Sequence, residues 1–176
     1  MANIVLSTLN ARYSHASLAL RYLKANLGSY EDQCVLLEFT IKADVDHVVS
    51  EILRRNPKIV GFGVYIWNVE ATTRVVEKLR LEAPHVAIVL GGPEVSFNLD
   101  GLSIVDFVDH VVQGEGEVHF REICHARLNE KDSAPPIKRK SLEIVSGVAL
   151  NMETAGPRIW PRQEPELGAI QLPYGL

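Results

Sequence analysis

The sequence predicts an α/β fold in which helices cover both faces of a doubly wound parallel sheet. Five short and almost continuously apolar runs alternate with segments whose apolar residues recur at helical spacing. Strands that are apolar on both sides indicate a parallel sheet, because the crossover helices must pack on its two faces. Two of the runs end in glycine signatures, Gly91-Gly92-Pro93-Glu94 and Gly114-Glu115-Gly116-Glu117, where a ligand can approach the backbone closely.

The first half of the chain contains two strand-helix units. Residues 3–9 form an apolar run, and apolar residues at helical spacing follow in residues 16–27. Residues 33–39 predict a second strand. The helix after it begins at Asp44, a favourable N-cap residue, and ends before Pro57.

Three further strands complete the predicted sheet. Residues 58–66 form the third strand and contain two glycines, and Asn68 is a suitable N-cap for the next helix. Residues 86–90 and 107–112 form the fourth and fifth strands, each directly followed by a glycine signature. The apolar positions of residues 120–128 lie on one face of a final helix.

Right-handed crossovers leave few topologies for five such strands. The economical choice is the flavodoxin-like order 2-1-3-4-5, which opens a ligand site at the switch point between strands one and three. We expect this domain to span residues 1–130. Residues 131–176 hold six of the nine prolines and predict a Pro-rich linker or C-terminal extension. Strand-like stretches at residues 142–152 and 157–160 allow a small hairpin within it.

Composition excludes several classes of protein. The chain has 176 residues, 47% of them hydrophobic, and a net charge of −4 with scattered cations, so nothing indicates a nucleic-acid partner. No apolar stretch is long enough to span a membrane, and the N-terminus does not resemble a signal peptide, so we expect a cytoplasmic protein. Cys34 and Cys124 lack C-x-x-C spacing and are expected to be reduced core residues.

Three familiar nucleotide or phosphate sites of this architecture are absent from the sequence. The loop after the first strand, residues 9–14, contains no glycine and so lacks the G-x-G-x-x-G of dinucleotide folds. The G-x-x-x-x-G-K-[ST] motif of P-loop proteins does not occur. A phosphoacceptor receiver domain would carry an Asp at the end of strand three, where this chain has Tyr65-Ile66-Trp67.

Four segments at the predicted strand ends resemble one family. They are Asn10-Ala11-Arg12-Tyr13-Ser14-His15, the segment from Val60 to Asn68, and the two glycine signatures, the second with Gln113 before it. In this order they resemble the N-terminal cobalamin-binding domain of radical S-adenosylmethionine enzymes, over residues 3–128. The resemblance implies cobalamin as cofactor and a radical S-adenosylmethionine domain as partner, in methyl transfer or related radical chemistry.

That chemistry requires a [4Fe-4S] cluster held by C-x-x-x-C-x-x-C, and a chain with two cysteines cannot supply it. We therefore expect no iron-sulfur cluster and no catalytic residues here. The end of the chain at Leu176, after a segment similar to the family's connector, favours a module of a longer enzyme. The alternative is a free-standing flavodoxin-like protein that binds or senses a flavin, a nucleotide or another ligand.

The resemblance implies a set of cofactor-binding residues at the strand ends. They are Tyr13, Ser14, His15, Tyr65, Ile66, Trp67, Gly91, Gly92, Pro93, Glu94, Gly114, Glu115, Gly116 and Glu117. The glycines would allow close backbone approach, the aromatic residues could press on the corrin, and the glutamates could bond its amides. Ordinary turns, core packing and helix-start charges explain the same residues individually, and Ser14 is also a candidate N-cap.

His15 occupies the position of the cobalt-ligating histidine in the D-x-H-x-x-G motif of methionine-synthase-type cobalamin proteins. Tyr13 replaces the Asp that would orient the imidazole, and Leu18 replaces the Gly that makes room for the nucleotide tail. We therefore expect His15 to lie near the cofactor without binding cobalt, and we expect no metal-ligating residue in this chain.

Overall fold

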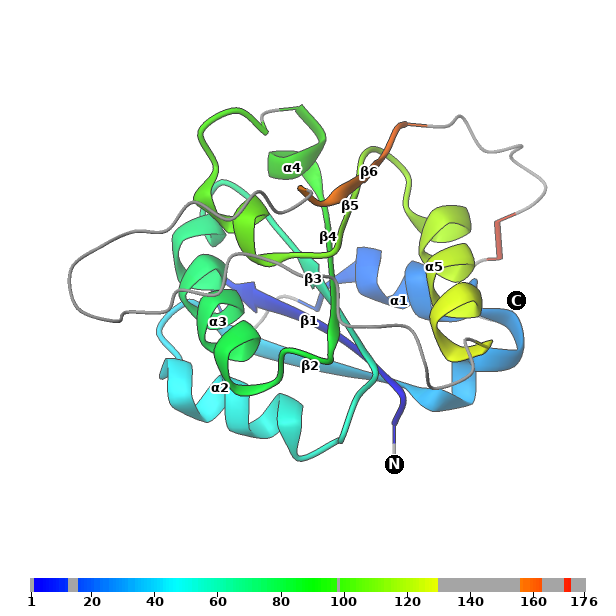
Figure 1. Ribbon diagram of the computed structural model, residues 1–176, viewed down its shortest axis with the longest axis horizontal. Coiled ribbons are helices and arrows are strands. Elements are labelled where there is room, and N and C mark those ends of the chain that lie inside the picture. Colours follow the sequence, from blue (N-terminus) through cyan, green and yellow to red (C-terminus); the bar gives the residue numbers. More distant parts are fainter. Residues whose placement is uncertain (1, 13–15, 98, 130–155, 163–169, 172–176) are drawn as a thin grey trace.

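The computed structural model describes residues 2–12, 16–97, 99–129, 156–162 and 170–171. Within these ranges the chain forms a six-stranded sheet in the order β2-β1-β3-β4-β5-β6, and every pair of neighbouring strands is parallel (Figure 1). The strands are β1 (Ile4–Asn10), β2 (Cys34–Thr40), β3 (Ile59–Gly63), β4 (Ala87–Gly91), β5 (His110–Val112) and β6 (Arg158–Trp160). The helices are α1 (Leu18–Ala25), α2 (Val45–Leu53), α3 (Val69–Glu82), α4 (Pro93–Phe97) and α5 (Glu117–Asn129), with 3-10 segments η1 (Gly28–Gln33) and η2 (Ser103–Phe107).

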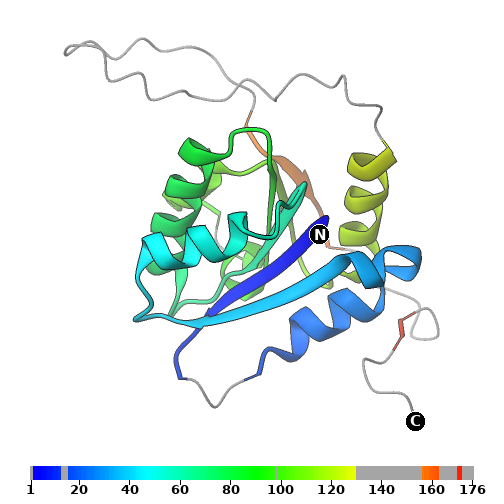
Figure 2. The same cartoon turned by 90° about the horizontal axis from the view of Figure 1, so that it is seen from below.

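Helices cover both faces of the sheet (Figures 1 and 2). Along each strand, alternate residues belong to two separate hydrophobic clusters, as the two-residue period of a strand requires. Val60 and Phe62 of β3 join the cluster with α2 and α3, whereas Ile59 joins the cluster with α1 and α5. The α/β class and the order 2-1-3-4-5 are confirmed for the strands that were predicted.

Two predicted strands are longer than the observed ones. The third strand ends at Gly63 and not at Ile66, because the backbone of Tyr65 bonds to Asn68 and not to a neighbouring strand. Tyr65 N donates to Asn68 Oδ1 at 2.8 Å and Asn68 N donates to Tyr65 O at 3.0 Å, so the chain turns toward α3. The start of the fifth predicted strand is instead the 3-10 segment η2, so β5 has only three residues.

A sixth strand comes from the C-terminal extension, within the strand-like stretch of residues 157–160. A hairpin was predicted for this stretch, but residues 158–160 instead pair in parallel with residues 110–112 of β5. Trp160 anchors this edge strand, because its indole N–H donates to His110 Nδ1 at 3.3 Å and the Arg158 guanidinium lies 4.2 Å from its ring. The other strand-like stretch of the predicted hairpin, residues 142–152, lies outside the described residues.

Both cysteines lie in the core on the α1 and α5 side of the sheet, without a disulfide. Burial raises the pKa of the Cys34 thiol to about 12 and raises that of Cys124 as well, so both thiols remain protonated. In the part of the chain that the structure describes, no helix combines the length and apolar character needed to cross a membrane.

Candidate functional site

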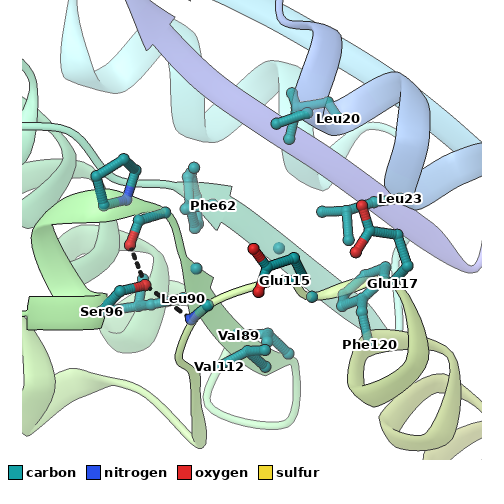
Figure 3. Close-up of a pocket in the computed structure, with 18 of the residues that line it drawn as sticks. Leu20, Leu23, Phe62, Val89, Leu90, Ser96, Val112, Glu115, Glu117 and Phe120 are labelled. Carbon is teal, nitrogen blue, oxygen red and sulfur yellow. Dashed lines mark hydrogen bonds between the residues drawn. The ribbon is translucent and has the colours of Figure 1, made fainter. Parts of the chain in front are cut away.

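A cavity of about 390 Å³ opens between the sheet and helices α1 and α5 at the carboxyl ends of the strands. Figure 3 shows its lining, with Leu20 and Leu23 from α1 and Phe120 from α5 on the helix side. Val89 and Val112 line it from β4 and β5. The lining is mainly apolar, as is usual for a pocket that binds a small organic molecule.

The cavity exists because glycines replace side chains on this face of the sheet. Gly61 and Gly63 of β3 and Gly91 of β4 alternate with residues that face α2 and α3, so all three point toward α1 and α5. Phe120 packs directly over Gly61, where a Cβ atom would come within 3.1 Å of its ring. At Gly63 a Cβ atom would meet only the Tyr65 and Thr8 side chains, at 3.5 Å or more, and at Gly91 only Val112 O, at 3.8 Å. Backbone at these two glycines therefore forms the floor of the cavity.

The two adjacent glycines at the end of β4 have different roles. Gly92 has φ +108°, and a Cβ atom there would lie 2.5 Å from Val64 O, so the backbone itself requires glycine. A Cβ atom at Gly91 would have Val112 O as its nearest neighbour, at an unstrained 3.8 Å. Gly91 therefore contributes empty space to the cavity, and Gly92 contributes the turn.

Ser96 connects the two glycine signatures. Its hydroxyl donates to Gly92 O at 2.8 Å and accepts from Gly114 N at 3.0 Å, as Figure 3 shows. The loop after β4 and the loop after β5 are thereby held together beside the cavity. Ser96 was not among the predicted residues, since its contact with Gly114 depends on the pairing of β4 with β5.

Asn68 ties the ends of β1 and β3 together at the predicted switch point. Its amide N–H group donates to Leu9 O and Gly63 O, each at 3.1 Å, and its Oδ1 accepts from Tyr65 N at 2.8 Å. The side chain is fully buried. Asn68 occupies the N-cap position of α3, but its side chain forms no capping bond with that helix and instead fixes the loop that carries Tyr65.

Glu38 on β2 anchors the loop between β1 and α1. Its carboxylate accepts from Asn10 at 2.9 Å and from the Ser17 N–H and the Arg21 guanidinium, each at 2.7 Å. Burial alone would raise the pKa of Glu38, but these hydrogen bonds outweigh burial and hold it below its usual value. Ser17 caps α1, while the candidate cap Ser14 lies outside the described residues, as do Tyr13 and His15.

Three charged side chains reach the cavity among the described residues: Glu115, Glu117 and Arg162. Glu117 Oε2 is buried and accepts no hydrogen bond in the described part of the chain. A buried carboxylate oxygen without a donor is costly, so this atom is available to a ligand N–H group. Arg162 Nε lies 3.6 Å from Glu115 Oε2 at the mouth of the cavity.

The structure brings eight of the fourteen predicted residues into the cavity lining. These are Tyr65, Gly91, Gly92, Pro93, Gly114, Glu115, Gly116 and Glu117. Ile66, Trp67 and Glu94 lie outside the lining, although Trp67 stacks on Tyr65 with ring centroids 4.6 Å apart. Besides Ser96, sequence reasoning missed Arg162 and the helix residues Leu20, Leu23 and Phe120, whose helical spacing indicated only core packing.

Exposed apolar side chains follow the same strand ends that form the cavity, and one of them, Phe97, lines it. Of the six large hydrophobic side chains that are exposed among the described residues, four follow the carboxyl ends of β1, β3 and β4. These four are Leu18, Ile66, Trp67 and Phe97. Ile66 and Phe97 are 76% and 80% exposed, which is unfavourable in water and typical of a surface that another molecule covers.

Most of the sequence matches one known protein family. Residues 4–124 match the family model described as B12 binding domain. Over 75 residues the chain is 32% identical to the cobalamin-dependent radical SAM methyltransferase TokK of Streptomyces tokunonensis. Over 74 residues it is 32% identical to the 2-(S-pantetheinyl)-carbapenam-3-carboxylate methyltransferase of Streptantibioticus cattleyicolor. Each match covers 42% of this chain and 11% of the relative, so the chain corresponds to a small part of these enzymes.

Two solved structures share the fold. A cobalamin-binding protein of Desulfitobacterium hafniense matches with a TM-score of 0.52 and 18% identity, over 71% of this chain and 58% of that protein. The radical S-adenosylmethionine methyltransferase TsrM of Kitasatospora setae was solved with cobalamin and a [4Fe-4S] cluster bound. It matches with a TM-score of 0.51 and 21% identity, over 76% of this chain and 28% of that protein. The family match spans more than half of the chain, and we conclude that this protein belongs to the B12-binding domain family.

Proposed function

We propose that this chain binds cobalamin at the carboxyl ends of β1, β3, β4 and β5. The observation that carries the proposal is the glycine-floored cavity, which lies at the same strand ends that carry exposed apolar side chains. Cobalamin has a wide, flat and mostly apolar corrin ring and a narrower nucleotide tail. The cavity is near the lower end of the usual range of about 300–1,000 Å³ for small-molecule pockets, which suits the tail better than the whole cofactor.

The residues present fit this cofactor in two respects. Backbone at Gly63 and Gly91 lets a planar group lie against the sheet, where any larger side chain would fill the space. Glu117 Oε2, which has no donor among the described residues, can accept from an amide N–H of the corrin edge. Tyr65 and Trp67 would cover the corrin from the loop after β3, held there by the hydrogen bond from Tyr65 N to Asn68.

We also infer that the chain serves as the cofactor-binding module of a radical S-adenosylmethionine enzyme. The two methyltransferases that it resembles support this inference, as does its own lack of cysteines for a cluster. Bound cobalamin would supply methyl-group transfer at its cobalt. The residues of this chain would bind and orient the cofactor and exclude water beneath it, and the radical chemistry would require a further domain.

The test is to mix the purified chain with hydroxocobalamin, remove free cofactor by desalting, and record the visible spectrum. The proposal expects corrin absorbance to remain with the protein at a ratio of about one to one. Flavin mononucleotide, treated identically, is the control for the flavodoxin-like alternative and should be lost. A colourless protein fraction with hydroxocobalamin, cyanocobalamin and cob(II)alamin would refute cobalamin binding by this chain.

His15 is tested by the same spectrum. We expect the substitution His15→Ala to leave the absorption maxima of bound cobalamin unchanged, because Tyr13 replaces the Asp that orients a cobalt-ligating histidine. A shift of the maxima with retained binding would identify His15 as a cobalt ligand.

A further inference from the structure

One wall of the cavity comes from the C-terminal extension and not from the five-stranded domain. After β6 the chain passes the end of β5, where Pro161 O lies 3.1 Å from His119 Nε2 on α5. Arg162 follows directly and lines the cavity. Strand β6 thus fixes where Arg162 enters the site.

Gly114 makes room for the Arg162 side chain. A Cβ atom at Gly114 would lie 2.6 Å from Arg162 Cγ and 3.1 Å from its Cβ, and Gly114 has φ +75°. The aliphatic part of Arg162 therefore lies directly on the backbone of the loop after β5. This contact gives the second glycine signature a role that its sequence position does not reveal, since its neighbour is 48 residues further along the chain.

Arg162 is the one cationic side chain among the described residues that line the cavity. Its present partner is a weak one, because Glu115 lies 3.6 Å away and the two side chains are 57% and 45% exposed. A guanidinium group recognises phosphate oxygens well, with paired N–H donors in a fixed plane. The phosphodiester of the nucleotide tail is the anionic group of cobalamin, because its corrin side chains are neutral amides.

We propose that Arg162 binds the phosphodiester of cobalamin and leaves Glu115 when the cofactor enters the site. The inference rests on the proposed function and adds a specificity: the extension selects corrinoids that carry the nucleotide tail. Glu115 holds Arg162 at the mouth in the free protein and competes with the phosphodiester for it.

The experiment measures the affinity of hydroxocobalamin and of cobinamide, which lacks the phosphate, ribose and base, by equilibrium dialysis. Arg162→Gln is expected to weaken cobalamin binding about tenfold, the effect of losing one charge-assisted hydrogen bond. The same substitution should leave the affinity for cobinamide unchanged within about twofold. Glu115→Gln should tighten cobalamin binding a few-fold, because the competing carboxylate is removed.

Arg158→Gln is the matched control. Arg158 is the same residue type on the same extension, but it packs on Trp160 and does not line the cavity. Because Arg158 helps to hold β6, this variant can weaken both corrinoids, but we expect it to leave the ratio of cobalamin affinity to cobinamide affinity unchanged. If Arg158→Gln lowers that ratio as much as Arg162→Gln does, Arg162 acts only through the position of β6, which overturns the inference.

The remaining outcomes are distinguishable from one another. If Arg162→Gln weakens cobalamin and cobinamide equally, Arg162 contacts the corrin or supports the fold, and the phosphodiester assignment is wrong. If Arg162→Gln leaves cobalamin affinity unchanged, the inference is wrong and the proposed function stands. If the wild-type chain retains neither corrinoid, the proposed function fails, and this inference fails with it.

Discussion

The adjacent glycines at the end of β4 allow a paired test of how the site is built. Gly92→Ala forces a non-glycine residue to φ +108° and brings its Cβ atom to 2.5 Å from Val64 O. The unusual dihedral costs about 1–3 kcal/mol and the overlap another ~1–3 kcal/mol. The expected loss in the free energy of unfolding is therefore about 2–6 kcal/mol, a large part of the ~5–15 kcal/mol that stabilises an ordinary domain.

Gly91→Ala should behave oppositely in the free protein. Its Cβ atom would lie 3.8 Å from the nearest atom, Val112 O, which is ordinary van der Waals contact. Alanine is favoured over glycine within a strand by roughly 0.5–1 kcal/mol, so the variant should be as stable as the wild type or slightly more stable. The new methyl group points into the cavity, and we expect cobalamin affinity to fall about tenfold through overlap of ~1–3 kcal/mol.

Urea denaturation followed by circular dichroism measures the free energy of unfolding, and equilibrium dialysis with hydroxocobalamin measures the cobalamin affinity. If Gly91→Ala is destabilised as strongly as Gly92→Ala, the division between a glycine for space and a glycine for backbone geometry is wrong. If Gly91→Ala is stable and binds cobalamin as tightly as the wild type, the ligand does not reach the floor of the cavity.

Three further predictions follow from the site. Asn68→Ala should lower the free energy of unfolding by about 3 kcal/mol in urea denaturation, because several buried backbone groups lose their hydrogen-bond partner. The control Asn129→Ala, at an exposed helix end, should lower it by less than ~0.5 kcal/mol. Equal effects would contradict the role of Asn68. The pKa of Glu38 is lowered in the folded state, so its contribution to the free energy of unfolding is present above the usual carboxyl range and is lost as pH falls through the folded pKa. Glu38→Gln should therefore lower the free energy of unfolding by ~1–2 kcal/mol at pH 7 and by progressively less below about pH 4. A difference from the wild type that does not change with pH would refute this. Glu117→Met, which removes both carboxylate oxygens, should lower the free energy of unfolding by no more than about 0.5 kcal/mol but weaken cobalamin binding several-fold in equilibrium dialysis. Unchanged affinity would exclude a hydrogen bond from cobalamin to Glu117.

The fold could be predicted from the sequence because its signals are local. Each signal affects the backbone only within a few residues of its own position. The signals are apolar runs of five to nine residues, an N-cap residue such as Asp44 and a helix-ending residue such as Pro57. Asp44 indeed caps α2 by accepting from His47 N at 3.0 Å. The third strand was predicted too long because Val64 to Ile66 continue its apolar pattern. The strand nevertheless ends at Gly63, because Tyr65 N donates to the Asn68 side chain, which is itself held by Leu9 O on β1.

The candidate site could be predicted only in part, because it depends on contacts between residues that are far apart in the sequence. The glycine signatures indicate where the backbone is accessible, and the sequence order places them at neighbouring strand ends. Which glycine provides space and which provides geometry depends on the distance from Gly92 to Val64. The bridge formed by Ser96 depends likewise on the pairing of β4 with β5.

The C-terminal extension shows most clearly what sequence reasoning could not reach. Residues 157–160 are recognisably strand-like in the sequence, but a stretch this short among prolines does not reveal which strand it pairs with. It is nevertheless placed on the sheet by backbone pairing with β5 and by the buried ring of His119, which lies 5.2 Å from the ring of Trp160. Because Arg162 follows this strand, the cation reaches the cavity without occupying a core position of the five-stranded domain. The domain can therefore keep an apolar, glycine-floored cavity while the extension supplies the charge, and truncation before residue 158 should preserve the sheet while removing any preference for corrinoids with a nucleotide tail.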